Sequence, residues 1–256
     1  MSDNNPLIVE VTRGDMVESR HRGHCVVADR TGASVHVWGD GDLLIYPRSA
    51  IKPLQALALI ETGAADACRL SATALHMGEP TKGYSGSDHP VQQRLAAIME
   101  EMGGVDLAAS SSGIDGCGIP VIGMPLTALA LALACMADGR DLDATRAAAC
   151  ARIIAAMTAN PNMIAGPGRF DTIAMTAGCG AFVVKAGAEG VYAGIVPGLG
   201  LGVALKIADG AKRAAEVAMA AVLEHLGVLE QMPETPVLNA AQAKVGVIRM
   251  GPDWPG

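Results

Sequence analysis

A stretch of 22 residues in the middle of the chain, 116–137, contains no charged side chain. A helix of that length could cross a bilayer. However, Pro120, Gly123 and Pro125 interrupt the first half, and the uninterrupted part, 126–136, is too short to span a membrane. The pattern therefore predicts a buried helix inside a globular protein and no membrane segment.

The composition restricts the kind of core that the chain can build. Half of the 256 residues are hydrophobic but only 3% are aromatic, so the core must be aliphatic. The length suits one large domain with a real core. With 19 basic and 26 acidic residues, and no run of Lys or Arg longer than two, we expect no nucleic-acid partner.

The N-terminal segment and the cysteines indicate the cellular compartment. The N-terminus shows no charged-then-apolar signal pattern. The six cysteines are scattered without a C-x-x-C pair, which is typical of reduced thiols. We therefore expect a cytoplasmic protein.

The hydrophobic patterns change from strand-like to helix-like and back again. This order predicts a single α+β domain over residues 1–256, in which strands from both ends form an antiparallel sheet with flanking helices. A helical portion at about 85–165 is inserted between those strands, and 233–256 reads as a loose tail with one short strand at 245–248. The expected strands are 7–12, 25–28, 35–38, 180–185, 190–196 and 202–207, and the expected helices are 49–63, 91–102, 126–136, 145–158 and 212–226.

The sharpest chemical motif is S-x-x-K, formed by Ser49 and Lys52 at the predicted start of a helix between Pro47 and Pro53. This spacing places both side chains on one helix face, and a helix N-terminus favours a developing oxyanion. Such a serine can attack an amide or β-lactam carbonyl if burial or a second cation favours the neutral form of the lysine. The alternative is that Ser49 merely caps the helix.

Lys206 is a second candidate. Alternation along 202–207 would place it on the opposite face from Leu205 and Ile207. In hydrolases of the β-lactamase type, a strand lysine faces the serine helix. The alternative is an edge-strand lysine exposed to water.

The loop around Cys117 contains the remaining candidates. Asp115 and Cys117 could contribute to a metal site, but zinc normally takes three or four protein ligands, so a small residue filling a tight loop is the other interpretation. His21 and His24 lie among arginines and read as part of a solvated loop between strands, with a role at the surface or at the mouth of a substrate site as the alternative.

Several blocks, in this order, resemble the asparaginase II family, the rhizobial-type Ser-Lys L-asparaginases. The likeness covers roughly residues 7–230. The blocks are VTRGDMVESRHRG at 11–23, PRSAIKPLQAL at 47–57, GYSGSDHPVQ at 83–92, GIDGC at 113–117, GPGR at 166–169, KAGAEGVY at 185–192 and GLGVALKIADG at 200–210.

The resemblance implies a serine β-lactamase/glutaminase-like fold, a possible homodimer and hydrolysis of L-asparagine to L-aspartate and ammonia. Family members use two Ser-Lys pairs and a zinc site of two cysteines and one lysine. Ser49 with Lys52 matches the first pair, and Lys206 matches the lysine of the second. Cys117 matches one zinc ligand, while Arg48 and Asp115 match positions near the substrate and the metal.

The chain departs from the family pattern after His76. Several dozen residues expected there, including the second serine and a C-S-G-K-H block, are missing. Lys206 therefore lacks its serine partner and Cys117 lacks both co-ligands, so the zinc ligand set is incomplete and we expect no cofactor. Three readings follow: an L-asparaginase, an amide hydrolase nearer a glutaminase or β-lactamase, or a deleted remnant that keeps only the fold.

Overall fold

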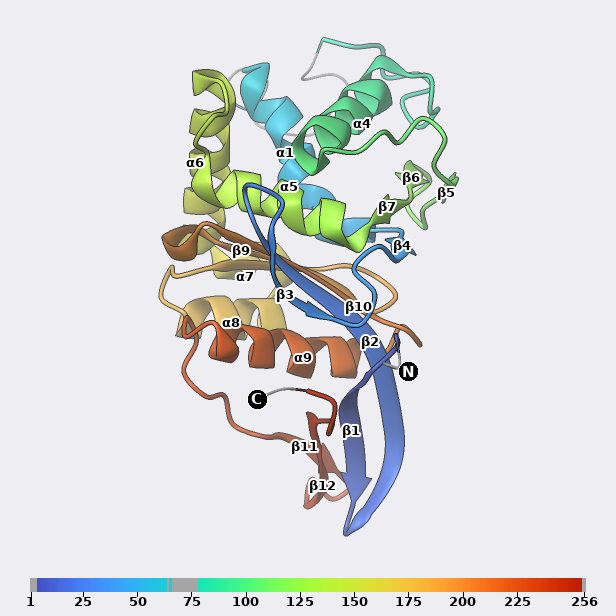
Figure 1. Cartoon of the computed structure of the whole chain (residues 1–256), viewed down its shortest axis with the longest axis vertical. Coiled ribbons are helices and arrows are strands. Elements are labelled where there is room, and N and C mark those ends of the chain that lie inside the picture. The colour runs from blue at the N-terminus through green and yellow to red at the C-terminus, as the bar shows by residue number, and fades with distance from the viewer. Residues whose placement is uncertain (1–3, 64, 66–77, 255–256) are drawn as a thin grey trace.

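The computed structural model describes residues 4–63, 65 and 78–254. The junction after His76 and the cysteine at position 68 lie outside the described residues. Figure 1 shows the main sheet between two layers of helices, with α1, α4, α5 and α6 on one side and α8 and α9 on the other. This arrangement confirms the predicted α+β class with an antiparallel sheet.

The main sheet is antiparallel, in the order β11-β12-β1-β2-β10-β9-β8, and β3 also pairs with β2. Two small sheets, β4 with β7 and β5 with β6, lie outside it. The strands of the main sheet are β1 (Leu7–Arg13), β2 (Met16–Asp29), β3 (Ser34–Trp38), β8 (Val183–Ala186), β9 (Val191–Val196), β10 (Leu201–Ile207), β11 (Thr235–Leu238) and β12 (Lys244–Met250). The short strands are β4 (Leu44–Ile45), β5 (Ser112–Ile114), β6 (Pro120–Ile122) and β7 (Met124–Pro125).

Most predicted helices are confirmed. At the start of α6, Oδ1 of Asp143 accepts from the Thr145 and Arg146 amides at 2.9 and 3.1 Å, which satisfies two of the free N–H groups of the first turn. The helices are α1 (Lys52–Glu61), α4 (Pro90–Gly103), α5 (Leu126–Asp138), α6 (Ala144–Ala159), α7 (Pro161–Ala165), α8 (Phe170–Ala177) and α9 (Lys212–His225), with 3₁₀ turns η1 (Arg48–Ile51) and η2 (Pro197–Leu199).

The uncharged stretch forms α5, which packs on β10, β2 and β9 as the central buried helix. Gly202 permits the close approach, because a Cβ there would lie 2.1 Å from the Ala130 carbonyl oxygen. No helix among the described residues is long and apolar enough to cross a membrane.

The two histidines predicted in a loop lie instead in β2, and both are buried. The prediction was wrong because β2 has 14 residues and pairs twice, first with β1 and then with β10 and β3. His21 Nδ1 lies 2.6 Å from Asp209 Oδ2, and the Asp40 amide donates to His24 Nδ1 at 2.9 Å.

The expected loose tail is also corrected. Residues 235–250 form the hairpin β11–β12, and β12 adds to the sheet beside β1, with Val9 opposite Met250 and Val11 opposite Ile248. Beyond β12, Trp254 stacks on Trp38 with ring centroids 4.4 Å apart, next to His225 at the end of α9. The pairing of β1 with β12 joins residues more than 230 positions apart, so no local sequence pattern could predict it.

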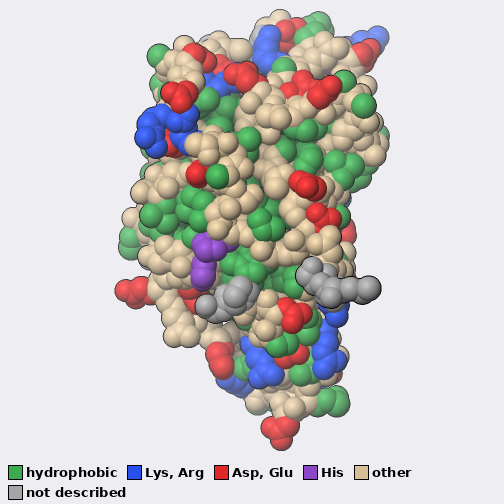
Figure 2. Space-filling model, in the orientation of Figure 1, with side chains coloured by type: hydrophobic (Ala, Val, Ile, Leu, Met, Phe, Trp, Pro, Cys, Tyr) green, Lys and Arg blue, Asp and Glu red, His purple; other side chains and the backbone are tan. Residues whose placement is uncertain are grey.

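Charged side chains of both signs are scattered over the face in Figure 2, without a continuous basic patch. The five described cysteines are all free. Cys25 and Cys150 are buried as expected of core residues, whereas Cys179 is exposed.

Candidate active site

The S-x-x-K motif spans two elements: Ser49 lies in the 3₁₀ turn η1, and Lys52 is the first residue of α1. A 3₁₀ turn brings positions i and i+3 close to alignment, so the two side chains project from one side of the segment. Ser49 caps neither helix, since the N-cap residues are Pro47 for η1 and Ile51 for α1. The capping interpretation is therefore wrong, and the hydroxyl remains available for another role.

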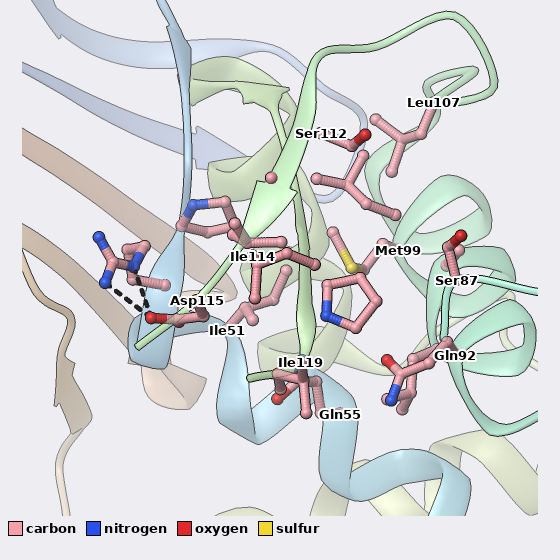
Figure 3. Close-up of a pocket in the computed structure, with 18 of the residues that line it drawn as sticks. Ile51, Gln55, Ser87, Gln92, Met99, Leu107, Ser112, Ile114, Asp115 and Ile119 are labelled. Carbon is pink, nitrogen blue, oxygen red and sulfur yellow. Dashed lines mark hydrogen bonds and ion pairs between the residues drawn. The ribbon is translucent and has the colours of Figure 1, made fainter. Parts of the chain in front are cut away.

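A cavity of about 740 Å³ opens next to this turn. In Figure 3 it lies between α1, α4 and the β5–β6 hairpin, with Gln92 and Ser87 on one side and Asp115 on the other. Of the six residues that match functional positions of the family, five line it: Arg48, Ser49, Lys52, Asp115 and Cys117. The rest of the wall is mainly aliphatic, with Ile51, Leu95, Met99, Leu107, Ile119 and Val121 among its members.

Arg48 connects the motif to the hairpin. Its Nε and Nη2 both donate to Asp115 Oδ1, at 3.1 and 2.6 Å (Figure 3). Hydrogen bonding from Arg48 holds the pKa of Asp115 below its usual range, and the Gly116 amide and the charge on Lys52 act in the same direction. Arg48 itself has φ of 53°, in the left-handed region that is uncommon for a side chain of this size. This local strain fits a residue whose direction matters.

Lys185, which sequence reasoning did not single out, lies on β8, a strand in contact with η1. Burial lowers the pKa of Lys185 most, Asp171 opposes this, and the positive charge on Lys52 lowers it further. The end of β8 packs closely against η1. A Cβ added at Gly187, directly after β8, would lie 2.9 Å from the Pro47 carbonyl oxygen. The only sequence signal was position, since Lys185 opens the KAGAEGVY block.

Asp171 and Tyr192 form a buried pair near Lys185. Asp171 accepts from the Tyr192 hydroxyl at 2.5 Å and from the Ala186 amide at 3.0 Å. These bonds fix the backbone next to Lys185. The pair gave no sequence signal because nothing in the pattern links α8 to β9.

Lys206 lies elsewhere. It lines a second cavity of about 560 Å³, together with His24, Tyr46, Glu189 and Arg48. The predicted alternation is confirmed, since Leu205 and Ile207 are fully buried, but β10 is an interior strand and not an edge. The strand register puts Lys206 and Lys185 on the same sheet face, two strands and two residues apart, or roughly 12 Å between Cα atoms. The structure thus sets Ser49 and Lys52 on one cavity, Lys185 on the strand that packs against η1, and Lys206 in the neighbouring cavity.

Cys117 is exposed at the tip of the β5–β6 hairpin, on the wall shared with Asp115 and Arg48. Within the described part of the chain, no group of three or more His, Cys, Asp or Glu side chains could hold a metal ion. A guanidinium beside the thiol also opposes a second cation. The described residues therefore do not fit a zinc site.

The sequence profile of the L-asparaginase II family matches residues 9–75 and 70–250. The chain belongs to the L-asparaginase II family. The two matched segments meet at 70–75, beside His76, where the resemblance predicts that family residues are missing. No curated protein sequence matches the chain.

Solved structures share the fold of this family member. The native form of Mglu superposes with a TM-score of 0.57 at 16% identity, over 80% of this chain and 64% of Mglu. A second Mglu structure gives a TM-score of 0.55 at 17% identity, over 81% of this chain and 67% of the other. A β-lactamase from Mycobacterium bovis gives a TM-score of 0.48 at 12% identity, over 79% and 94%. The chain spans about two thirds of the length of Mglu, and the likeness shows the fold alone.

Proposed function

We propose that this family member hydrolyses the side-chain amide of L-asparagine to L-aspartate and ammonia, with Ser49 as nucleophile and Lys52 as base. The observation that carries the proposal is that Ser49 and Lys52 line one cavity with Arg48 and Asp115. A nucleophile, a base and two groups of opposite charge for a zwitterionic substrate are thereby available at one place.

The reaction needs neutral Lys52 at its start. Lys52 Nζ takes the proton from Ser49 Oγ, which attacks the amide carbon and forms a tetrahedral oxyanion. Collapse breaks the C–N bond as Lys52 gives its proton to the leaving nitrogen, so ammonia departs and an acyl-enzyme remains. Water then attacks the ester with Lys52 as base, and L-aspartate leaves with Ser49 restored. No step is routed through a metal.

The oxyanion needs donors at the start of η1. The Ala50 amide already donates to the Pro47 carbonyl at 3.1 Å, so it is not available. We assign this role to the amide of Ser49 itself, because the first N–H groups of a helix have no partner within the helix.

The charged pair at the cavity wall would orient the substrate. Asp115 would accept from the α-ammonium group, and Arg48 would donate to the α-carboxylate, as a guanidinium does well. Arg48 and Asp115 already form an ion pair with each other in this structure. The α-ammonium and α-carboxylate groups of the substrate would bind beside that pair.

Lys185 would add a second positive charge to the site. Burial holds the pKa of Lys185 below its ordinary range. The resemblance gives the place of the second lysine to Lys206, and we assign it to Lys185 because η1 packs against β8 and β9.

The direct test is ammonia release from L-asparagine by the unaltered chain and by Ser49→Ala. The variant should lose about a thousandfold or more of the rate, the scale seen on removing a nucleophile. Ser87→Ala, on the opposite side of the same cavity, is the matched control and should keep its rate. Equal rates in Ser49→Ala and the unaltered chain would show that Ser49 is not the nucleophile.

A second candidate is a larger amide. A cavity of about 740 Å³ with a mainly aliphatic wall is in the range that holds drug-sized ligands, roughly 300–1,000 Å³, and exceeds what asparagine fills. L-Glutamine and a chromogenic β-lactam in the same assay separate these substrates. No turnover on any of them by a chain with a folded circular-dichroism spectrum would identify an inactive remnant.

We further propose a cytoplasmic homodimer that needs no zinc. Light scattering on a size-exclusion column tests the dimer. Metal analysis after dialysis tests the zinc statement, and one tightly held equivalent that survives a chelator would overturn it.

A further inference from the structure

The second cavity lies across Arg48 from the proposed active site. Its floor is one row of the sheet, His24 on β2, Lys206 on β10 and Val191 on β9, which pair directly and so project from the same face. The short strand β4, Tyr46 and Arg48 form the other side. The cavity measures about 560 Å³ and has charged groups at its base.

Lys206 makes no ion pair at contact distance within residues 4–63 and 78–254. Its Nζ donates to the Glu189 and Ile207 carbonyl oxygens, at 2.5 and 2.8 Å, which leaves one N–H direction free. Burial lowers the pKa of Lys206, and the charges on Glu189 and Asp209 oppose this without a direct contact. An anionic ligand that accepts from the free N–H would stabilise this half-buried ammonium further.

His24 adds a neutral donor to the same cavity. The Asp40 amide donates to its Nδ1, so that nitrogen is an acceptor and the ring proton is on Nε2. Burial lowers the pKa of His24, and the charge on Lys206 lowers it further. The imidazole is therefore held as an N–H donor next to a cation.

Glu189 supplies the opposite charge. It lines the cavity at the turn before β9, and its carboxylate acts on both Lys206 and Arg48. Cationic donors and an exposed carboxylate within one small cavity match the two charges of a free amino acid.

We propose that this second cavity binds an α-amino acid, with the carboxylate on Lys206 and the ammonium group on Glu189. Arg48 lines both cavities, so an amino acid bound here lies next to the Arg48–Asp115 pair of the active site. The site does not depend on Ser49, and its test uses no turnover.

The experiment measures binding of L-aspartate to the full chain carrying Ser49→Ala, by calorimetry and by NMR of the His24 ring. The His24 resonances should shift on addition of L-aspartate. Lys206→Met in the same background should weaken binding by about tenfold or more, as expected for the loss of a charged hydrogen bond. Lys212→Met, an exposed lysine on α9 paired with Glu216, is the control and should bind normally.

Glu189→Gln separates an amino acid from a simple carboxylate and does not alter the central strand. It should weaken L-aspartate but not succinate, which lacks the ammonium group. The site would be overturned if the His24 resonances did not shift when L-aspartate binds. It would also be overturned if Lys206→Met bound L-aspartate as tightly as the Ser49→Ala background does. Equal weakening of both ligands by Glu189→Gln, or of neither, would overturn the amino-acid assignment.

Discussion

Arg48 ties the S-x-x-K turn to the β5–β6 hairpin by donating twice to one oxygen of Asp115, a residue 67 positions further along the chain. The bond joins the predicted nucleophile segment to the opposite wall of its cavity. It also keeps Asp115 ionised, because hydrogen bonding from Arg48 lowers the pKa of that carboxyl.

Replacing this arginine should move the acid limb of the activity profile. A carboxyl with a lowered pKa stays ionised until the pH falls below its ordinary range, and without Arg48 it would take up its proton at a higher pH. In Arg48→Gln, kcat/KM for L-asparagine should therefore begin to fall at a higher pH. Arg13→Gln, in the distant β1–β2 turn, is the control. An unchanged acid limb would detach Asp115 from substrate binding.

Removing the charge on Lys185 should reduce activity at neutral pH. Lys185→Met removes a cation from the strand that packs on η1 and should lower kcat/KM for L-asparagine by about tenfold, the scale of one charged hydrogen bond. Lys185→Arg keeps the charge and should retain most of the rate. Equal losses in Lys185→Met and Lys185→Arg would indicate a structural role instead.

Arg146 is expected to matter for stability. It donates to both carboxylate oxygens of Glu61 on α1, at 2.6 and 3.1 Å, and pairs with Glu101 on α4. Arg146→Met leaves a half-buried carboxylate without its partner and should cost about 2 kcal/mol in urea unfolding. Arg140→Met, whose side chain is 76% exposed, is the comparison and should unfold as the unaltered chain does. Equal unfolding of the two variants would mean that the Glu61 contact adds nothing.

The aromatic cluster should make stability depend on pH. Burial lowers the pKa of His36, and nearby His225 lowers it further, so the folded chain binds this proton less readily than the unfolded chain does. Below the ordinary value of 6.5 the unfolded state takes up more protons, and stability should fall with pH until the folded group also titrates. His36→Gln should flatten this slope. A slope that the substitution leaves unchanged would assign the effect to other groups.

Trp254 should hold the C-terminal segment on this cluster. Loss of the stacked contact with Trp38 in Trp254→Ala should lower the free energy of unfolding by about 1–3 kcal/mol. Trp254→Phe should recover part of that loss. Full stability in Trp254→Ala would show that the stack is incidental.

The sequence predicted those elements whose cause is local. The helix expected at 145–158 is present as α6, capped by Asp143, and alternation in β10 put Lys206 opposite Leu205 and Ile207. The predictions failed for residues whose strand partners lie far away in the sequence. His21 and His24 looked like loop residues because β2 is continuous through them, and the strand opposite His24, β10, lies far along the chain.

The candidate site divides in the same way. Ser49 and Lys52 could be paired from spacing alone, although the turn is 3₁₀ rather than α-helical. Which lysine lies close to them depends on the order β10-β9-β8 and on where η1 packs. Both are properties of the assembled sheet, so no reading of single segments could choose Lys185 over Lys206.

The partnership of β1 with β12 also bears on how the protein is made. Residues 7–13 leave the ribosome well before the strand that covers their free edge, because that strand lies more than 230 residues further along the chain. Until residues 244–250 emerge, β1 presents an open edge that can pair with other chains. Slow elongation, or loss of β12, should therefore raise aggregation during synthesis more than it harms the chemistry of the finished protein.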